Sequence, residues 1–152
     1  LLKMDGPLDL IINLLLLGML AGIGEELLFR GIIQKEIHQQ WQRPHFAIWV
    51  TAFIFAAFHF QVIGFFPKMM IGAVLGYAYL YSGSLILPMF IHVLNNSFAT
   101  LSYYFSGGTL AEESKPDAHV PLSLVLISTL ISFMIFYLIK QKSSPPKSQI
   151  DE

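Results

Sequence analysis

The sequence predicts an all-α membrane protein, a polytopic bundle of about five transmembrane helices. Of its 152 residues, 55% are hydrophobic and only 12% are charged, whereas soluble domains usually carry roughly 25% charged residues. The charged residues gather in short stretches, which leaves long apolar segments between them. Apolar segments of about 20 residues are typical of helices that cross a membrane.

Composition also excludes several classes of partner and chemistry. A net charge of -1 provides no basic surface for a phosphate backbone, so we expect no nucleic-acid partner. The absence of cysteine excludes disulfides, thiolate metal ligands and cysteine nucleophiles. The chain begins with Leu1 and no signal sequence precedes its first apolar segment, so we expect a fragment that lacks amino-terminal helices of a longer protein. Nothing in the sequence indicates an oligomeric state.

The first predicted helix covers residues 8–38. An apolar segment starts at Leu10, and helical character continues through the acidic pair that follows it. A polar turn with Trp41 and Pro44 separates it from a second helix, residues 46–60. At about 1.5 Å per residue this second helix is only ~22 Å long, shorter than the ~30 Å hydrocarbon core. It therefore needs shelter from its neighbours or a continuation beyond its end.

The third predicted helix covers residues 67–81. Pro67 suits its first position, because the first residue of a helix needs no N–H donor. Gly72 and Gly76 then form a small-xxx-small face on this helix. Such a face permits close packing against another helix.

A Ser-Gly-Ser turn at residues 82–84 leads into a fourth predicted helix, residues 85–105, which is the most polar of the set. Residues 120–139 contain no charge and are predicted to be the last span. The polar residues 143–152 are expected to be a disordered tail. The predicted membrane domain is therefore residues 1–142.

The distribution of basic residues predicts an orientation. If each helix crosses once, one side of the membrane carries six basic residues and the other carries three. The larger set is Arg30, Lys35, Arg43, Lys140, Lys142 and Lys147, and the smaller set is Lys3, Lys68 and Lys115. The positive-inside rule then predicts an integral membrane protein, in the cell membrane if its source is bacterial, with a cytoplasmic carboxyl terminus.

An ionisable residue inside a membrane span is costly and therefore marks a candidate functional site. The first helix contains Glu25-Glu26-x-x-x-Arg30. Glu26 and Arg30 share one helical face, whereas Glu25 points elsewhere and has no cation from its own helix. A solvated acid pair at a helix end is the alternative, but apolar residues follow the pair directly, which favours a functional role.

Two further polar clusters lie on the later helices. Phe55-x-x-x-His59 stacks an aromatic ring and an imidazole, and His92-x-x-x-Asn96 puts an imidazole and an amide on one face. Each alone is also consistent with an interface residue or with hydrogen bonding between helices. Together with a free carboxylate, the two histidines and the amide can activate water and stabilise an oxyanion.

Several protease signatures are missing from the sequence. It contains no His-Glu-x-x-His of zinc metalloproteases and no Gly-x-Ser-x-Gly elbow of serine hydrolases. Gly-x-Gly-Asp, which is typical of intramembrane aspartyl proteases, is also absent. These designs are therefore not expected.

The motifs resemble those of the CPBP membrane proteins, the CAAX proteases and bacteriocin-processing enzymes, which include the type II CAAX prenyl endopeptidases. The likeness covers residues 21–100, with one motif on each of three apolar helices. In family order the motifs are Glu25-Glu26-x-x-x-Arg30, Phe55-x-x-x-His59 and His92-x-x-x-Asn96. The stretch from Gly72, Gly76 and Tyr79 into Ser82-Gly83-Ser84-Leu85 also resembles the family's connection between its second and third motifs.

The resemblance implies an intramembrane endopeptidase that processes CAAX-type carboxyl termini or bacteriocin-like peptides. By analogy, Glu25 and His59 would position and deprotonate the attacking water, while His92 and Asn96 would bind the oxyanion. The remaining charged residues of the first motif would support the site, namely Glu26 and Arg30. Its partners would be the lipid bilayer and a peptide or lipidated protein substrate.

The convergence of Glu25 and His59 is the open geometric question. Glu25 lies deep along the first predicted helix and His59 near the far end of the second. Their approach requires helix tilt, a kink near residues 22–24, or a longer second helix.

The sequence leaves alternatives for metal and for function. The family has been described as metal-dependent, and Glu25, His59 and His92 could supply three zinc ligands. We favour a mechanism without a metal or other cofactor. A non-enzymatic immunity or scaffold protein could use the same polar set for packing, and a proton-coupled transporter could use it as a relay. No repeat favours the transporter.

Overall fold

A computed structural model describes residue 4, residues 6–62 and residues 64–105. All regular structure in this part of the chain is helical, as predicted. The chain divides into two units, residues 1–108 and residues 109–152, and the described residues all belong to the first. The predicted helix over residues 120–139 and the predicted tail lie outside the described residues, so the extent of the predicted membrane domain stays a prediction.

One long helix runs without interruption from Pro7 to Trp41. Pro7 stands at its first position, where the missing N–H has no cost. The helix ends where Gln42 takes a left-handed conformation with φ of 53° and donates its backbone N–H to the His38 carbonyl. It contains two π-helical segments, and its parts are α1 (Pro7–Asn13), η1 (Leu14–Leu20), α2 (Ala21–Leu28), η2 (Phe29–Gln34) and α3 (Lys35–Trp41). The helix therefore reaches three residues beyond the predicted end.

The second predicted helix is α4 (Pro44–Ala57), which starts and ends earlier than predicted. Pro44 opens the helix rather than preceding it. The helix stops before His59. The backbone N–H groups of His59 and Phe60 donate to carbonyls only three residues earlier, and Phe60 adopts a positive φ of 51°. The predicted extension of the second helix therefore does not explain how His59 approaches the site.

The third and fourth predicted helices are α5 (Phe65–Ser82) and α6 (Ile86–Phe105). The prediction that Pro67 is the first residue of its helix was wrong, because α5 begins two residues earlier. Pro67 still lies in the first turn, where backbone N–H groups have no partner within the helix. The turn between the two helices places Gly83 at a left-handed φ of 64°, a conformation that suits glycine.

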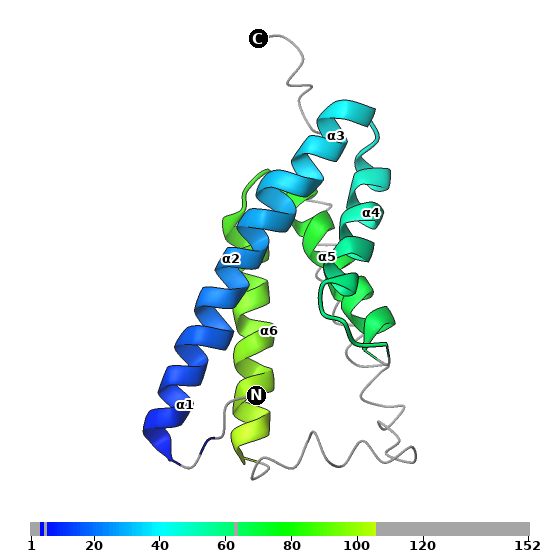
Figure 1. The fold of residues 1–152 in the computed structure, drawn as a ribbon. Helices are drawn as coiled ribbons and strands as arrows, with labels where there is room; N and C mark the ends of the chain where they lie inside the picture. Colours follow the sequence, from blue (N-terminus) through cyan, green and yellow to red (C-terminus); the bar gives the residue numbers. More distant parts are fainter. Residues whose placement is uncertain (1–3, 5, 63, 106–152) are drawn as a thin grey trace, which may run out of the picture. The chain divides into compact units, whose positions relative to one another are not determined.

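The helices pack as two pairs, the long helix with α6 and α4 with α5 (Figure 1). Glycines allow both close approaches. A Cβ at Gly22 would lie 3.2 Å from the backbone nitrogen of Val93 on α6, and a Cβ at Gly72 would lie 3.1 Å from Ala52 Cα on α4. The predicted small face of the third helix therefore meets α4, where Ile48, Ala52 and Ala73 form the apolar core.

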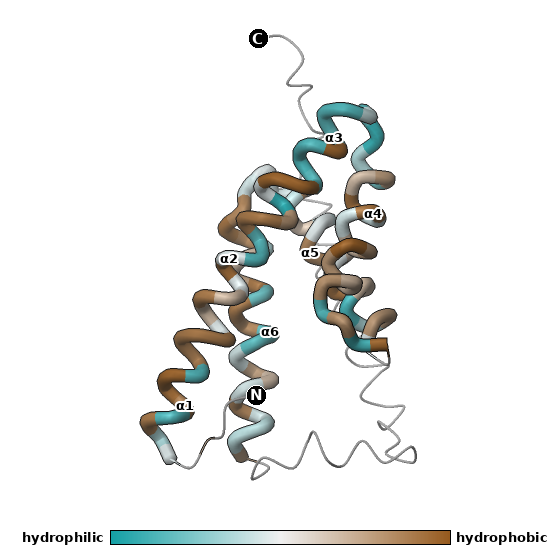
Figure 2. Tube along the Cα trace, viewed as in Figure 1, coloured by the Kyte–Doolittle hydropathy of each residue, from teal (hydrophilic) through white to brown (hydrophobic). Residues whose placement is uncertain are grey.

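Within the described residues, only the helix Pro7–Trp41 is long and apolar enough to cross a membrane. The helix α4 is apolar but shorter, so the predicted bundle of about five spans is not confirmed. The helix α6 contains hydrophilic as well as hydrophobic positions (Figure 2). His92 and Asn96 are among its polar residues. Length and apolarity alone do not separate a membrane span from the core helix of a soluble protein or from a signal sequence.

The long helix differs from a buried core helix in its exposed surface. Hydrophobic colour dominates α1 and α2, whereas the end of α3 and the following turn are hydrophilic (Figure 2). The exposed large apolar side chains of this helix before its polar end are Leu8, Ile11, Ile12, Leu15, Leu16, Met19, Leu20, Leu27, Leu28 and Ile32. Such a surface is suited to lipid or to further apolar helices.

Candidate active site

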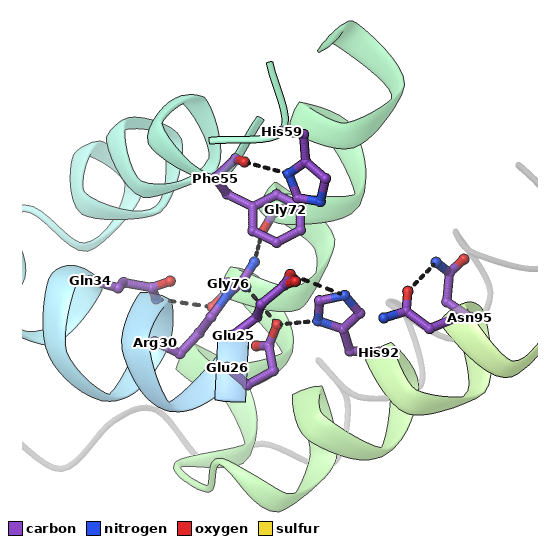
Figure 3. A network of polar contacts seen from close by, with 11 residues as sticks. Glu25, Glu26, Arg30, Gln34, Phe55, His59, Gly72, Gly76, His92 and Asn95 are labelled. Carbon is purple, nitrogen blue, oxygen red and sulfur yellow. Dashed lines mark hydrogen bonds and ion pairs between the residues drawn. The ribbon is translucent and has the colours of Figure 1, made fainter. Parts of the chain in front are cut away.

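Glu26 is the centre of a buried polar network between three helices (Figure 3). Its side chain is inaccessible to solvent, and its Oε1 accepts two hydrogen bonds. One comes from Arg30 Nη1 at 2.6 Å, one turn along the same helix, and the other comes from His92 Nδ1 on α6 at 2.7 Å. The structure contains the predicted pairing of Glu26 with Arg30 and adds a histidine to it.

The Arg30 guanidinium connects this network to α5 and α4. It is fully buried, its Nη2 donates to the Gly72 carbonyl at 2.6 Å, and its Cζ lies 5.3 Å from the centre of the Phe55 ring. A buried ion pair is stable only where further hydrogen bonds replace the lost water. Here the Glu26 carboxylate and the Gly72 carbonyl accept from Nη1 and Nη2, and the Phe55 ring lies against the guanidinium. Arg30 Nε and Glu26 Oε2, in contrast, are buried without a hydrogen-bond partner among the described residues.

His92 presents one nitrogen to each glutamate. A carboxylate only accepts hydrogen bonds, so the Nδ1–H of His92 donates to Glu26. Its Nε2 lies 3.7 Å from Glu25 Oε2, which is longer than a hydrogen bond. The Glu25 side chain is 31% exposed, yet its Oε2 atom is buried and has no hydrogen-bond partner in the part of the chain that the structure describes. Glu25 is thus a free acceptor that faces a histidine of another helix.

His59 reaches the site through an aromatic contact. It is partly buried just after α4, and its Nδ1–H donates to the Phe55 carbonyl at 2.8 Å, which leaves Nε2 as an acceptor. The Phe55 ring centre lies 4.8 Å from that of His59 and 5.7 Å from that of His92. Phe55 therefore lies between the two histidines, and in the described part of the chain His59 has no hydrogen bond to either glutamate.

Asn96 lies one turn beyond His92 on α6. Its Nδ2 donates to the Leu17 carbonyl at 3.1 Å, in the π-helical segment η1. The Nδ2 atom of the preceding residue, Asn95, lies 3.5 Å from Asn96 Oδ1. Asn96 therefore ties α6 to the long helix and keeps a second amide hydrogen that this bond does not use.

The second motif approaches the first through packing of the helices, but within the described residues no contact joins Glu25 to His59. Residues 22–24 lie within the continuous α-helix α2, so a break there does not bring the motifs together. The helix α5 packs beside α4 and binds Arg30 of the long helix through Gly72. It thereby places Phe55 against Arg30 and His92, and His59 contacts Phe55 rather than the glutamates.

Sequence reasoning missed Gln34 as part of this network. It is buried on η2, four residues after Arg30, and its Nε2 donates to the Gly76 carbonyl at 3.1 Å. The available signal was its spacing, since Glu26, Arg30 and Gln34 follow one another at intervals of four on one helical face. Gly72 and Gly76 were recognised for packing and for their resemblance to the family's connecting stretch, whereas their carbonyls also accept hydrogen bonds.

The three possible zinc ligands, Glu25, His59 and His92, do not form a metal-binding group. Among the described residues, no three His, Cys, Asp or Glu side chains are grouped so that they could hold a metal ion. The Nδ1–H groups of both histidines donate to the protein and leave the Nε2 atoms available, as in many metal-binding histidines, so the misfit lies in the separation of the side chains. The residues present thus do not fit a zinc site in this arrangement.

Comparisons with known proteins agree with the motif pattern. A family model described as type II CAAX prenyl endopeptidase Rce1-like matches residues 7–98, which include all three motifs and more than half of the chain. The uncharacterized protein YpbD of Bacillus subtilis (strain 168) is 29% identical over 112 residues, which are 71% of this chain and 53% of that protein. The chain thus spans about half the length of this curated relative. No solved structure matches the chain.

Proposed function

Because this chain belongs to the Rce1-like family of type II CAAX prenyl endopeptidases, we propose that it is an intramembrane endopeptidase. One observation carries the proposal: among the described residues the Glu25 carboxylate has a buried oxygen without a hydrogen-bond partner, beside a histidine that the Glu26–Arg30 pair orients. An unpaired carboxylate oxygen next to an oriented imidazole is suited to proton transfer with water.

The proposed location is the membrane. The long apolar helix and its exposed apolar side chains support it, and a site within such helices suits membrane-associated substrates. The distribution of basic residues supports a cytoplasmic carboxyl terminus. Labelling of single introduced cysteines from each side of a vesicle tests this orientation, since the chain has none of its own.

Glu25 is the proposed base. Its free Oε2 would take a proton from a water molecule while the water oxygen forms a bond to the carbonyl carbon of the scissile peptide. His59 would hold that water through Nε2, because its Nδ1–H is already committed to the Phe55 carbonyl. When the C–N bond breaks, Glu25 would return the proton to the leaving amine.

His92 and Asn96 are the proposed oxyanion donors. With a proton on each ring nitrogen, His92 would donate from Nε2 to the oxyanion while its Nδ1–H donates to Glu26. The second amide hydrogen of Asn96 would be the other donor. Glu26 and Arg30 would support the site rather than contact the reacting atoms.

The substrate class follows from the family and remains part of the proposal. We propose CAAX-type carboxyl termini or bacteriocin-like membrane peptides, cleaved without a metal cofactor. The test uses the full-length protein in lipid nanodiscs and a panel of prenylated and unprenylated peptides, with products identified by mass spectrometry.

The decisive variant in this assay is Glu25→Gln. We expect turnover to fall by at least about 100-fold, the scale of a lost general base. The matched control is Glu36→Gln, which makes the same change at an exposed position of the same helix and should keep full activity. Turnover retained in Glu25→Gln would refute the proposed mechanism. A wild-type protein inactive on every peptide would favour a non-enzymatic scaffold or immunity protein.

A further inference from the structure

Gln34 makes a second link between the long helix and α5, next to that of Arg30 (Figure 3). Arg30 donates to the Gly72 carbonyl and Gln34 donates to the Gly76 carbonyl. The donors are four residues apart on one helix, and the acceptors are four residues apart on the other. Two bonds with this spacing fix how far α5 can slide along the long helix, which a single bond does not.

The close contact at Gly76 leaves no room for a side chain. A Cβ at this position would lie 2.8 Å from Gln34 Oε1 and 3.0 Å from Ile48 Cγ2. Gln34 is only 4% exposed, and its Oε1 is buried without a hydrogen-bond partner among residues 6–62 and 64–105. A buried unpaired amide oxygen is unfavourable, so an apolar residue would fill the same space at lower cost. An apolar residue would, however, lack the hydrogen bond that Gln34 Nε2 donates to the Gly76 carbonyl.

The position of α5 determines the position of the second motif. A Cβ at Gly72 would lie 3.2 Å from Phe55 Cδ1, so the backbone of α5 lies directly against this ring. Phe55 in turn contacts both histidines of the site and accepts the hydrogen bond that orients His59. A shift of α5 along the long helix would therefore move His59 relative to Glu25.

We propose that Gln34 is a positioning residue of the active site, which acts by holding α5, and with it Phe55 and His59, in register with the glutamates of the long helix. This inference rests on the proposed peptidase function. In the proposed reaction, Gln34 contacts no reacting atom. Its effect on the reaction passes entirely through the geometry of the neighbouring helices.

The test is Gln34→Met, which keeps a side chain of similar volume and removes the N–H donor. Gln40→Met is the matched control, because it makes the same change at an exposed position of the same helix. Spin labels on introduced cysteines report helix positions, and no native cysteine interferes. Suitable exposed sites are Ile32 on the long helix, Phe53 on α4 and Val74 on α5.

We expect Gln34→Met to lower kcat by about tenfold, a scale reached by small misplacements of reacting groups, with KM changed by less than about twofold. The Ile32–Val74 and Ile32–Phe53 label distances should shift or broaden, while Gln40→Met changes none of these values. Rates are normalised to folded protein by size-exclusion chromatography. If Gln34→Met does not fold, Gln34→Asn removes the same bond, since its amide is one methylene shorter.

The possible outcomes separate this proposal from the one on which it rests. An active wild-type protein whose Gln34 variant keeps both kcat and the label distances overturns the role of Gln34 alone. Changed distances with unchanged kcat overturn it as well, because the register would not matter to the reaction. A wild-type protein inactive on the whole peptide panel overturns the proposed function, and the role of Gln34 with it.

Discussion

The Nδ1–H of His92 donates a 2.7 Å hydrogen bond to Glu26 Oε1, across 66 positions of sequence and between two helices. The same oxygen accepts from Arg30 at 2.6 Å. One carboxylate oxygen therefore both neutralises a buried cation and fixes which nitrogen of His92 remains available. Its neighbour Glu25 has no hydrogen bond to either residue among those described and lies 3.7 Å from His92 Nε2, so the two adjacent acids have separable roles in stability and in chemistry.

This separation predicts that removing each acid changes stability by a different amount. Glu26→Ala leaves Arg30 as a buried unpaired cation and should lower the free energy of unfolding by about 3–5 kcal/mol. Glu25→Ala removes a carboxylate that has no hydrogen bond at its buried oxygen, so its effect should stay below about 1 kcal/mol. Reversible denaturant unfolding in detergent micelles measures both values. A Glu25 variant as unstable as the Glu26 variant would contradict the assignment.

The geometry of Arg30 predicts that lysine cannot replace it. Arg30 donates in two directions, to Glu26 and to the Gly72 carbonyl, both at 2.6 Å. A lysine keeps the charge but has a single ammonium on a flexible stem. We expect Arg30→Lys to destabilise the fold by about 1–3 kcal/mol, the scale of a lost hydrogen bond to a charged group. Arg43→Lys, at an exposed site before α4, is the control and should be neutral in the same unfolding measurement.

Helical periodicity explains which parts of this site could be predicted from the sequence. The Glu26–Arg30 pair depends only on spacing within one helix, so the sequence was sufficient to identify it. The bond from His92 to Glu26 joins distant helices, and periodicity indicates the face of each residue but not which faces meet. Gln34 carries no charge to mark it inside an apolar segment, and its acceptor is a backbone carbonyl that no sequence pattern identifies.

The ends of the helices were predictable only to within a few residues. The end of α4 depends on the positive φ of Phe60, a conformation uncommon for an aromatic residue and not indicated by its type. The start of α5 precedes Pro67 by two residues, because proline is tolerated throughout the first turn and does not identify a single position.

The close approach of α6 to the long helix predicts an effect of substitution at Gly22. A Cβ there would lie 3.2 Å from both the backbone nitrogen and Cγ2 of Val93, the residue after His92. Gly22→Ala should therefore move α6, lower the free energy of unfolding by about 1–3 kcal/mol and reduce peptidase turnover.

Gly24→Ala provides the matched control for this prediction. A Cβ at Gly24 meets nothing within 4 Å, and alanine favours a helix over glycine by about 0.5–1 kcal/mol. This variant should be neutral or slightly more stable, with unchanged turnover. Equal effects of the two alanines would show that helix propensity rather than contact with α6 governs this segment.

Removal of metal should leave activity intact. In the proposed reaction Glu25 and His59 activate the water, and the described residues hold no group of three ligands for a metal ion. Protein dialysed against a strong chelator should keep its turnover of the peptide panel and should contain less than stoichiometric zinc by elemental analysis. Turnover that disappears on chelation and returns when zinc alone is added would instead require Glu25, His59 and His92 to rearrange around the metal. In that case the 3.7 Å separation of Glu25 and His92 would belong to a metal-free resting state.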